Sequence, residues 1–167
     1  ALRVMQWRNR DLDFRSLDQL RKSLGSLPGR DGLTRAQPNP DIEALESICR
    51  EESTRRLVNS PFEVERAWDV CQIPDYRNIS PAEHAHLISR VINFLQSKQG
   101  VIDEDWFAKQ LAFCENLEGN IDALSQRISH VRTWTFIANR ADWLEAPTYW
   151  QSRAREIEDR LSDVLHE

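Results

Sequence analysis

Three helix-start signals of one kind recur along the middle of this chain and constrain its fold more than any other feature. They are Asn39-Pro40, Ser60-Pro61 and Ser80-Pro81. Proline suits the first position of a helix because its missing N–H would have no partner there, and a preceding Ser or Asn can cap the free amides. Ser60 and Ser80 are each followed three positions later by a glutamate, which is the spacing of a capping box. Successive helices are therefore predicted to begin near residues 40, 61 and 81.

Further helix boundaries are predicted on both sides of this region. Ser16 can cap a helix that stops at Gly25, Asp103 and Asn120 can cap two later helices, and Pro147 can begin the last one. Strand signals are weak outside the first residues, where the pattern fits either an extended segment or a short helix. We therefore expect an all-α fold, an irregular bundle of about seven helices, with an extended or short-helical N-terminal segment.

A loop-forming stretch divides the chain near its first quarter. Residues 25–40 read GSLPGRDGLTRAQPNP, in which three Gly and three Pro occur among sixteen residues. We expect a connector over residues 1–38, with one short helix and this loop, followed by a helical domain over residues 39–167. The chain begins at Ala1, and an apolar stripe is still running near Leu165 when it ends, which indicates a domain cut from a longer protein.

Catalytic motifs are weak in this sequence. Val101-Ile102-Asp103-Glu104-Asp105 imitates the metal-binding strand end of a nucleotide hydrolase, but none of the glycines precedes a lysine, as a phosphate cradle requires. An acidic helix start explains that stretch better. His84 and His86 point apart on a helix and cannot share one metal ion from it. We therefore expect no catalytic residue, metal site or cofactor within this chain.

The cysteines and the hydropathy indicate a cytoplasmic protein. Cys49, Cys71 and Cys114 are odd in number and far apart, so three reduced, buried thiols are expected rather than disulfides or a zinc site. No apolar run is long enough to span a bilayer, so we expect no membrane partner.

The charge is unevenly distributed and bears on nucleic-acid binding. The net charge is −5, but residues 1–35 hold eight basic and four acidic side chains, or +4, which leaves −9 for the remainder. The N-terminal segment interleaves Trp7 and Phe14 with arginines, among which Arg8 and Arg10 are candidate nucleic-acid contacts. The alternative is a connector whose aromatic rings pack against a neighbouring domain.

A second aromatic and basic stretch, HVRTWTFIANRADWL, covers residues 130–144. On a helix that starts at Asn120, Trp134 and Ile137 fall outside the apolar sector that holds Val131, so apolar residues cover most of the second half of this helix and it is predicted to lie at the centre of the bundle. Most of the rings in the stretch then belong to the core. Arg132 and Arg140 remain as candidate nucleic-acid contacts.

Several segments resemble one protein family. The clearest is residues 61–77, PFEVERAWDVCQIPDYR, with its C-x-x-P and the apolar helix that follows. It is similar to the region after the motor domains in superfamily-two DExH helicases related to the RNA helicase of the mitochondrial degradosome. The segments RTWTF at residue 132, ADWL at residue 141 and IEDRLSD at residue 157 resemble the larger alphaproteobacterial members. The likeness extends over residues 33–167 and consists mainly of packing residues.

The resemblance implies a non-catalytic accessory domain of an ATP-dependent RNA or DNA helicase, which supports the motor domains, lines part of the single-strand path, or contacts a nuclease partner. ATP and Mg²⁺ would bind the motor domains of the parent chain, because no motor motif occurs here. The implied partners are those motor domains, single-stranded RNA or DNA, and a nuclease. The alternative is an all-α protein-interaction scaffold from another multidomain protein.

Overall fold

The computed structural model describes residues 5–26, 33–35 and 39–167. The chain divides into two compact units, which are described separately below. The first unit comprises Ala1–Gln72 and Pro81–Asn93, and the second comprises Ile73–Ser80 and Phe94–Glu167. The domain boundary expected at residue 38 lies outside the described residues, and the chain on both sides of it belongs to the first unit.

The first unit is built from α1 (Leu17–Leu24), α2 (Pro40–Arg50), α3 (Glu52–Arg55), α4 (Pro61–Cys71) and most of α5 (Pro81–Leu95). Helix α2 packs against α1, α3 and α4. Leucine and other aliphatic side chains fill the interior, and those buried almost completely include Leu20, Leu45, Ile48, Val64 and Ile88. A buried polar contact accompanies them, because the Thr54 and Ser89 hydroxyl oxygens lie 2.8 Å apart.

The N-terminal segment of the first unit is extended. Strand β1 (Met5–Trp7) pairs in parallel with β2 (Leu33–Arg35), with Met5 opposite Leu33. Strand β2 lies within the Gly/Pro-rich stretch that the sequence predicted to be a loop. A three-residue strand carries too little pattern to be recognised, because its pairing depends on a partner distant in sequence.

The predicted helix starts are confirmed where the structure gives their hydrogen bonds. At α4, the Glu63 N–H donates to the Ser60 Oγ at 3.2 Å, and the Ser60 N–H donates to the Glu63 carboxylate at 3.1 Å, which completes the capping box. The side chains of Ser16, Asp103 and Asn120 accept from the backbone of α1, α6 and α7 in the same way.

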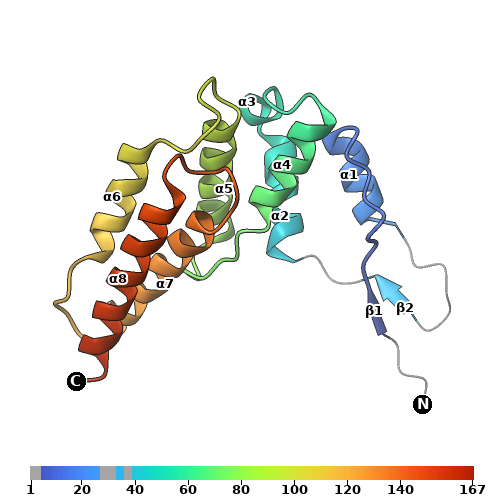
Figure 1. Ribbon diagram of the computed structural model, residues 1–167. Helices are drawn as coiled ribbons and strands as arrows, with labels where there is room; N and C mark the ends of the chain where they lie inside the picture. The colour runs from blue at the N-terminus through green and yellow to red at the C-terminus, as the bar shows by residue number, and fades with distance from the viewer. Residues whose placement is uncertain (1–4, 27–32, 36–38) are drawn as a thin grey trace, which may run out of the picture. The chain divides into compact units, whose positions relative to one another are not determined.

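The second unit contains α6 (Glu104–Cys114), α7 (Ile121–Ala138) and α8 (Pro147–Leu165). In Figure 1 these three helices lie side by side, and α7 packs against both α6 and α8. Aromatic rings form the centre of the unit. The Trp134 ring lies edge-on to Trp106 and Phe107, with centroids 5.7 and 5.9 Å apart, and Phe107 lies edge-on to Trp150 at 5.2 Å.

Helix α7 is central, as the sequence predicted. Val131 and Ala138 lie on one side of the helix and Trp134 and Ile137 on the adjoining side, and each of the four is at most 2% exposed. The Ile102 N–H donates to the Trp143 carbonyl at 2.8 Å and joins the connection before α6 to the turn after α7. Neighbours on several sides therefore fix both α7 and the turn that follows it.

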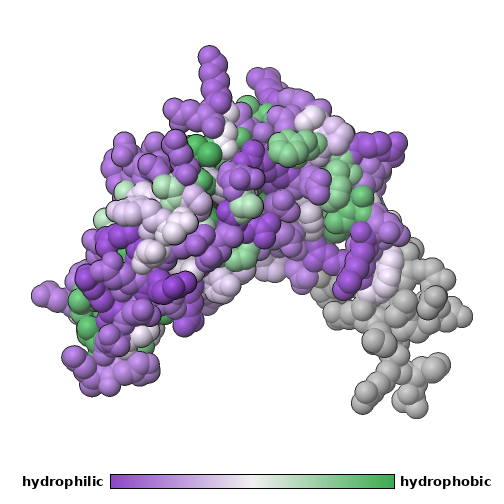
Figure 2. All heavy atoms as spheres, viewed as in Figure 1, coloured by the Kyte–Doolittle hydropathy of each residue, from purple (hydrophilic) through white to green (hydrophobic). Residues whose placement is uncertain are grey.

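The all-α fold class is confirmed. Eight helices and one short strand pair make up the regular structure of the described residues. Among these helices, none combines the length and apolar character that crossing a bilayer requires. Figure 2 shows a mainly hydrophilic face with smaller apolar areas.

Candidate nucleic-acid interface

A surface groove of about 360 Å³ lies in the second unit, along the C-terminal half of α7. Its lining combines aromatic, amide, hydroxyl and guanidinium groups: Tyr76, Arg132, Thr135, Phe136, Asn139 and Arg140. Five of the six belong to α7 or the turn after it, at spacings that place them on one side of the helix. The structure therefore brings the predicted residues Arg132 and Arg140 into one groove.

Helix α7 ends earlier than the apolar pattern suggested. The sequence projection continued the helix past residue 140, but α7 ends at Ala138, and the Asn139 N–H donates to the Thr135 carbonyl at 3.1 Å. The Asn139 side-chain amide donates to the same carbonyl at 2.8 Å. The chain then turns, and Asp142 adopts a left-handed φ of 65°. Arg140 consequently lies on a turn rather than on the helix.

Arg140 is placed by two aromatic rings. Its guanidinium carbon lies 5.6 Å from the Phe136 ring centroid and 5.4 Å from that of Trp143. Trp143 is buried at 3% exposure, whereas Phe136 is half-buried and lines the groove. Both rings attract the cation through their π faces. A planar cation next to a partly exposed ring is the combination that stacks an unpaired base.

Arg132 reaches the groove from the exposed side of α7. Its Nε donates to the Glu158 carboxylate of α8 at 3.0 Å, and the two side chains are 57% and 27% exposed. Such an exposed ion pair is worth about 0–1 kcal/mol. The guanidinium can therefore exchange Glu158 for another anion at little cost.

Sequence reasoning missed Tyr76. This residue lies in the connection 73–80, is 43% exposed and lines the groove together with residues of α7 and the turn after it. It stands more than fifty positions before Arg132, so no local pattern links the two. The one available signal was an aromatic residue next to Arg77 in a Pro- and Asn-containing loop, which is a common composition for surface contacts.

The charge of the groove differs from that of the chain. Its lining carries two cationic side chains and no carboxylate, while the chain has a net charge of −5. Two other clefts among the described residues contain carboxylates, and the one in the first unit mixes them with arginines. One cleft of the second unit is lined by Asp103, Glu104, Asp105 and Glu145. The groove is thus a local exception that favours an anionic ligand.

The other two predicted contacts belong to the first unit. The Arg8 guanidinium donates to the Asp41 carboxylate at 2.8 Å and lies 5.3 Å from the Trp68 ring centroid. Arg10 is exposed. Arg8 therefore attaches the N-terminal segment to α2 and α4 of the same unit, and neither Arg8 nor Arg10 lines the groove.

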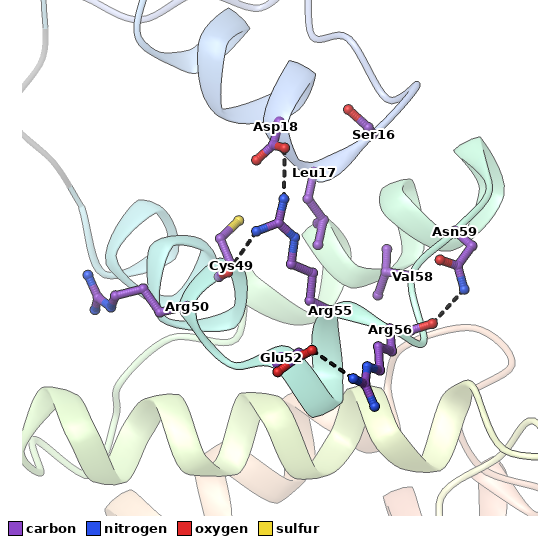
Figure 3. Close-up of a pocket in the computed structure, with 10 residues that line it drawn as sticks. All are labelled: Ser16, Leu17, Asp18, Cys49, Arg50, Glu52, Arg55, Arg56, Val58 and Asn59. Atoms are coloured by element: carbon purple, nitrogen blue, oxygen red, sulfur yellow. Dashed lines mark hydrogen bonds and ion pairs between the residues drawn. The ribbon is translucent and has the colours of Figure 1, made fainter.

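A larger cleft of about 540 Å³ in the first unit contains three arginines, Arg50, Arg55 and Arg56 (Figure 3). Arg55 pairs with Asp18 at 2.8 Å, and Arg56 pairs with Glu52 at 2.7 Å. Figure 3 shows the three guanidinium groups pointing apart. Because the guanidinium groups do not converge and the carboxylates of Asp18 and Glu52 line the cleft itself, this cleft is a weaker anion site than the groove.

The acidic stretch at residues 103–105 begins a helix, as predicted. The Asp103 carboxylate accepts from the Trp106 N–H at 3.2 Å, and the Glu104 carboxylate accepts from the Trp150 indole N–H at 3.3 Å. Over the part of the chain that the structure describes, no three His, Cys, Asp or Glu side chains are grouped so that they could hold a metal ion.

The three cysteines are free and buried. Burial raises the pKa of all three thiols, that of Cys114 to about 11. Because the thiolate is the reactive form, these side chains are poor nucleophiles in the folded protein.

Comparison of the chain with protein-family models, curated proteins and solved structures gives no significant match.

Proposed function

We propose that the chain is a non-catalytic helical accessory domain of an ATP-dependent RNA or DNA helicase, and that the groove of its second unit contacts the single strand. The observation that carries this proposal is the groove lining, where Tyr76 and Phe136 accompany Arg132 and Arg140 without a carboxylate. Aromatic rings can stack on bases, and guanidinium groups can contact the backbone phosphates.

The sequence supports the proposed place of this domain in a helicase chain. Residues 61–77 and three later segments resemble the helical region that follows the motor domains in DExH helicases. ATP and Mg²⁺ would be held by motor domains in the same parent chain, and a nuclease is a further proposed partner. The three free, buried thiols fit a reducing compartment, so we propose the cytoplasm as its location.

The charge sets the expected strength of binding. Backbone phosphates supply most nucleic-acid affinity, and a chain with a net charge of −5 repels a polyanion at long range. We therefore expect the isolated chain to bind single strands weakly and in a salt-sensitive way.

Fluorescence anisotropy with labelled single-stranded RNA and DNA at low salt tests this proposal. The double variant Arg132→Ala/Arg140→Ala should lose about tenfold in affinity, since it removes two cationic contacts. The control is Arg56→Ala/Arg160→Ala, which removes the same charge from exposed, ion-paired arginines elsewhere. An equal loss in both variants, or no binding by the unaltered chain, would overturn the proposal.

A second candidate function is an all-α protein-interaction scaffold. Large apolar side chains are exposed at Phe62, Phe113 and Ile121, each more than 60% accessible. Pull-down of one specific protein partner, lost when these side chains are changed to Ser and unaffected by Arg132→Ala/Arg140→Ala, would favour the scaffold.

A further inference from the structure

Glu158 occupies the place next to Arg132 where an anionic ligand of the groove would bind. Its carboxylate Oε1 accepts from the Arg132 Nε at 3.0 Å, and it reaches this position from α8, one helix away. Glu158 does not itself line the groove. Arg132 is therefore paired with a carboxylate from outside the groove, and Arg140 lies against the rings of Phe136 and Trp143.

A carboxylate and a phosphodiester satisfy a guanidinium in similar ways. Both present oxygen atoms that accept charge-assisted hydrogen bonds from the planar N–H groups of arginine. The Arg132 side chain is 57% exposed, so it is open to solvent from the side that Glu158 leaves uncovered. A backbone phosphate and Glu158 would then compete for the same guanidinium.

We infer that Glu158 is an internal competitor for the phosphate subsite of the groove, and that a single-strand phosphodiester binds by displacing this carboxylate from Arg132. This inference rests on the proposed function and adds to it the residue that limits the affinity. In the bound state Arg132 donates to the phosphate, Glu158 turns to solvent, and an unpaired base stacks on Phe136 beside Arg140.

Neighbouring residues on α8 supply a matched control. Glu156 lies two positions before Glu158, and its carboxylate accepts from Arg160 at 2.6 Å and from Arg153 at 3.4 Å. It has no described bond to a groove residue. Glu158→Gln and Glu156→Gln remove one negative charge from the same helix, so a general charge effect would act equally in both.

The test is anisotropy of the whole chain with a labelled oligouridylate, oligothymidylate and an uncharged methylphosphonate analogue. Removing an exposed ion pair worth up to about 1 kcal/mol should tighten binding of the charged strands about two- to fivefold in Glu158→Gln. Glu156→Gln should change the affinity for the charged strands by less than half of the change that Glu158→Gln produces. Glu158→Gln should bind the uncharged analogue no more tightly than the unaltered chain does. The gain in affinity for the charged strands should vanish when Arg132 is also changed to Ala.

The outcomes separate this inference from the proposed function. If the unaltered chain binds through Arg132 and Arg140 but Glu158→Gln leaves its affinity unchanged, only the competitor role is wrong. An equal gain in Glu156→Gln also overturns that role, because it identifies a general charge effect. If neither the unaltered chain nor Glu158→Gln binds any strand, the groove is not a nucleic-acid site and both proposals fail.

Discussion

The Arg140 guanidinium lies 5.4 Å from the ring centroid of the buried Trp143, three residues further along the chain. The same guanidinium lies 5.6 Å from Phe136, which lines the groove. Trp143 is fixed in turn by its carbonyl, which accepts the Ile102 N–H at 2.8 Å. The turn after α7 therefore holds a planar cation in place beside a partly exposed ring.

This arrangement requires arginine rather than a positive charge alone. Arg140→Lys keeps the charge but loses the planar group that stacks against the rings. We expect Arg140→Lys to weaken single-strand binding about threefold or more, while the free energy of unfolding falls by about 1 kcal/mol or less. Anisotropy and urea denaturation measure the two effects. Wild-type affinity in Arg140→Lys would show that only charge matters.

Arg8 has a structural role that can be measured. It bonds to Asp41 at 2.8 Å and lies over Trp68, with the two ion-pair side chains 28% and 12% exposed. Arg8→Ala should lower the free energy of unfolding by about 1–2 kcal/mol, because it leaves a half-buried carboxylate without its partner.

The exposed Arg10 supplies the control for this experiment. Arg10→Ala should change stability by less than about 0.5 kcal/mol in the same urea titration. Equal, small effects of the two substitutions would contradict an attachment role for Arg8.

His130 makes the stability of the chain depend on pH. Burial lowers the pKa of His130 below its usual range, and the nearby Arg77 cation lowers it further. The unfolded chain therefore takes up this proton at a higher pH than the folded chain. The contribution of neutral His130 to the free energy of unfolding is fully present above about pH 6.5. It is lost as the pH falls through the pKa of the folded state.

Urea titrations of the wild type and His130→Gln at about pH 7.5 and about pH 5 measure this effect. The loss of stability on acidification should be smaller in His130→Gln, because the substituted side chain does not titrate. An identical loss in both proteins would assign the acid sensitivity to other groups.

The cysteines should be unreactive until the chain unfolds. Cys49, Cys71 and Cys114 are 6%, 1% and 0% exposed, and burial raises the pKa of each thiol. An aromatic disulfide reagent should therefore label none of them quickly in native buffer and all three in denaturant. Rapid labelling of one thiol in native buffer would show that its surroundings open without global unfolding.

The helix starts could be predicted because their signals are local. Ser60 and Glu63 lie within one turn of each other, and Asn120 caps α7 through its own neighbours. The end of α7 could not be predicted, because no Gly or Pro directly follows Ala138 and the turn depends on the Asn139 side chain and on packing around Trp143. Strand pairing between residues 5–7 and 33–35 likewise depends on a contact distant in sequence.

The groove was only half predictable for the same reason. Arg132 and Arg140 could be selected because both stand outside the apolar faces of one helix. Tyr76 comes from a separate connection, and Glu158 comes from α8, so their relation to Arg132 exists only after the helices have packed. Residues that meet through tertiary packing leave no periodic trace in the sequence.

The most direct test of the groove is a photo-cross-link between the chain and a single-stranded oligonucleotide that carries a photoreactive thiopyrimidine. Stacking should bring the base next to Tyr76 and Phe136, so peptides containing these residues should carry the cross-link, and Arg132→Ala/Arg140→Ala should abolish it. Cross-links confined to residues 5–26 or to the arginine cleft of the first unit, with the groove peptides unlabelled, would contradict the account.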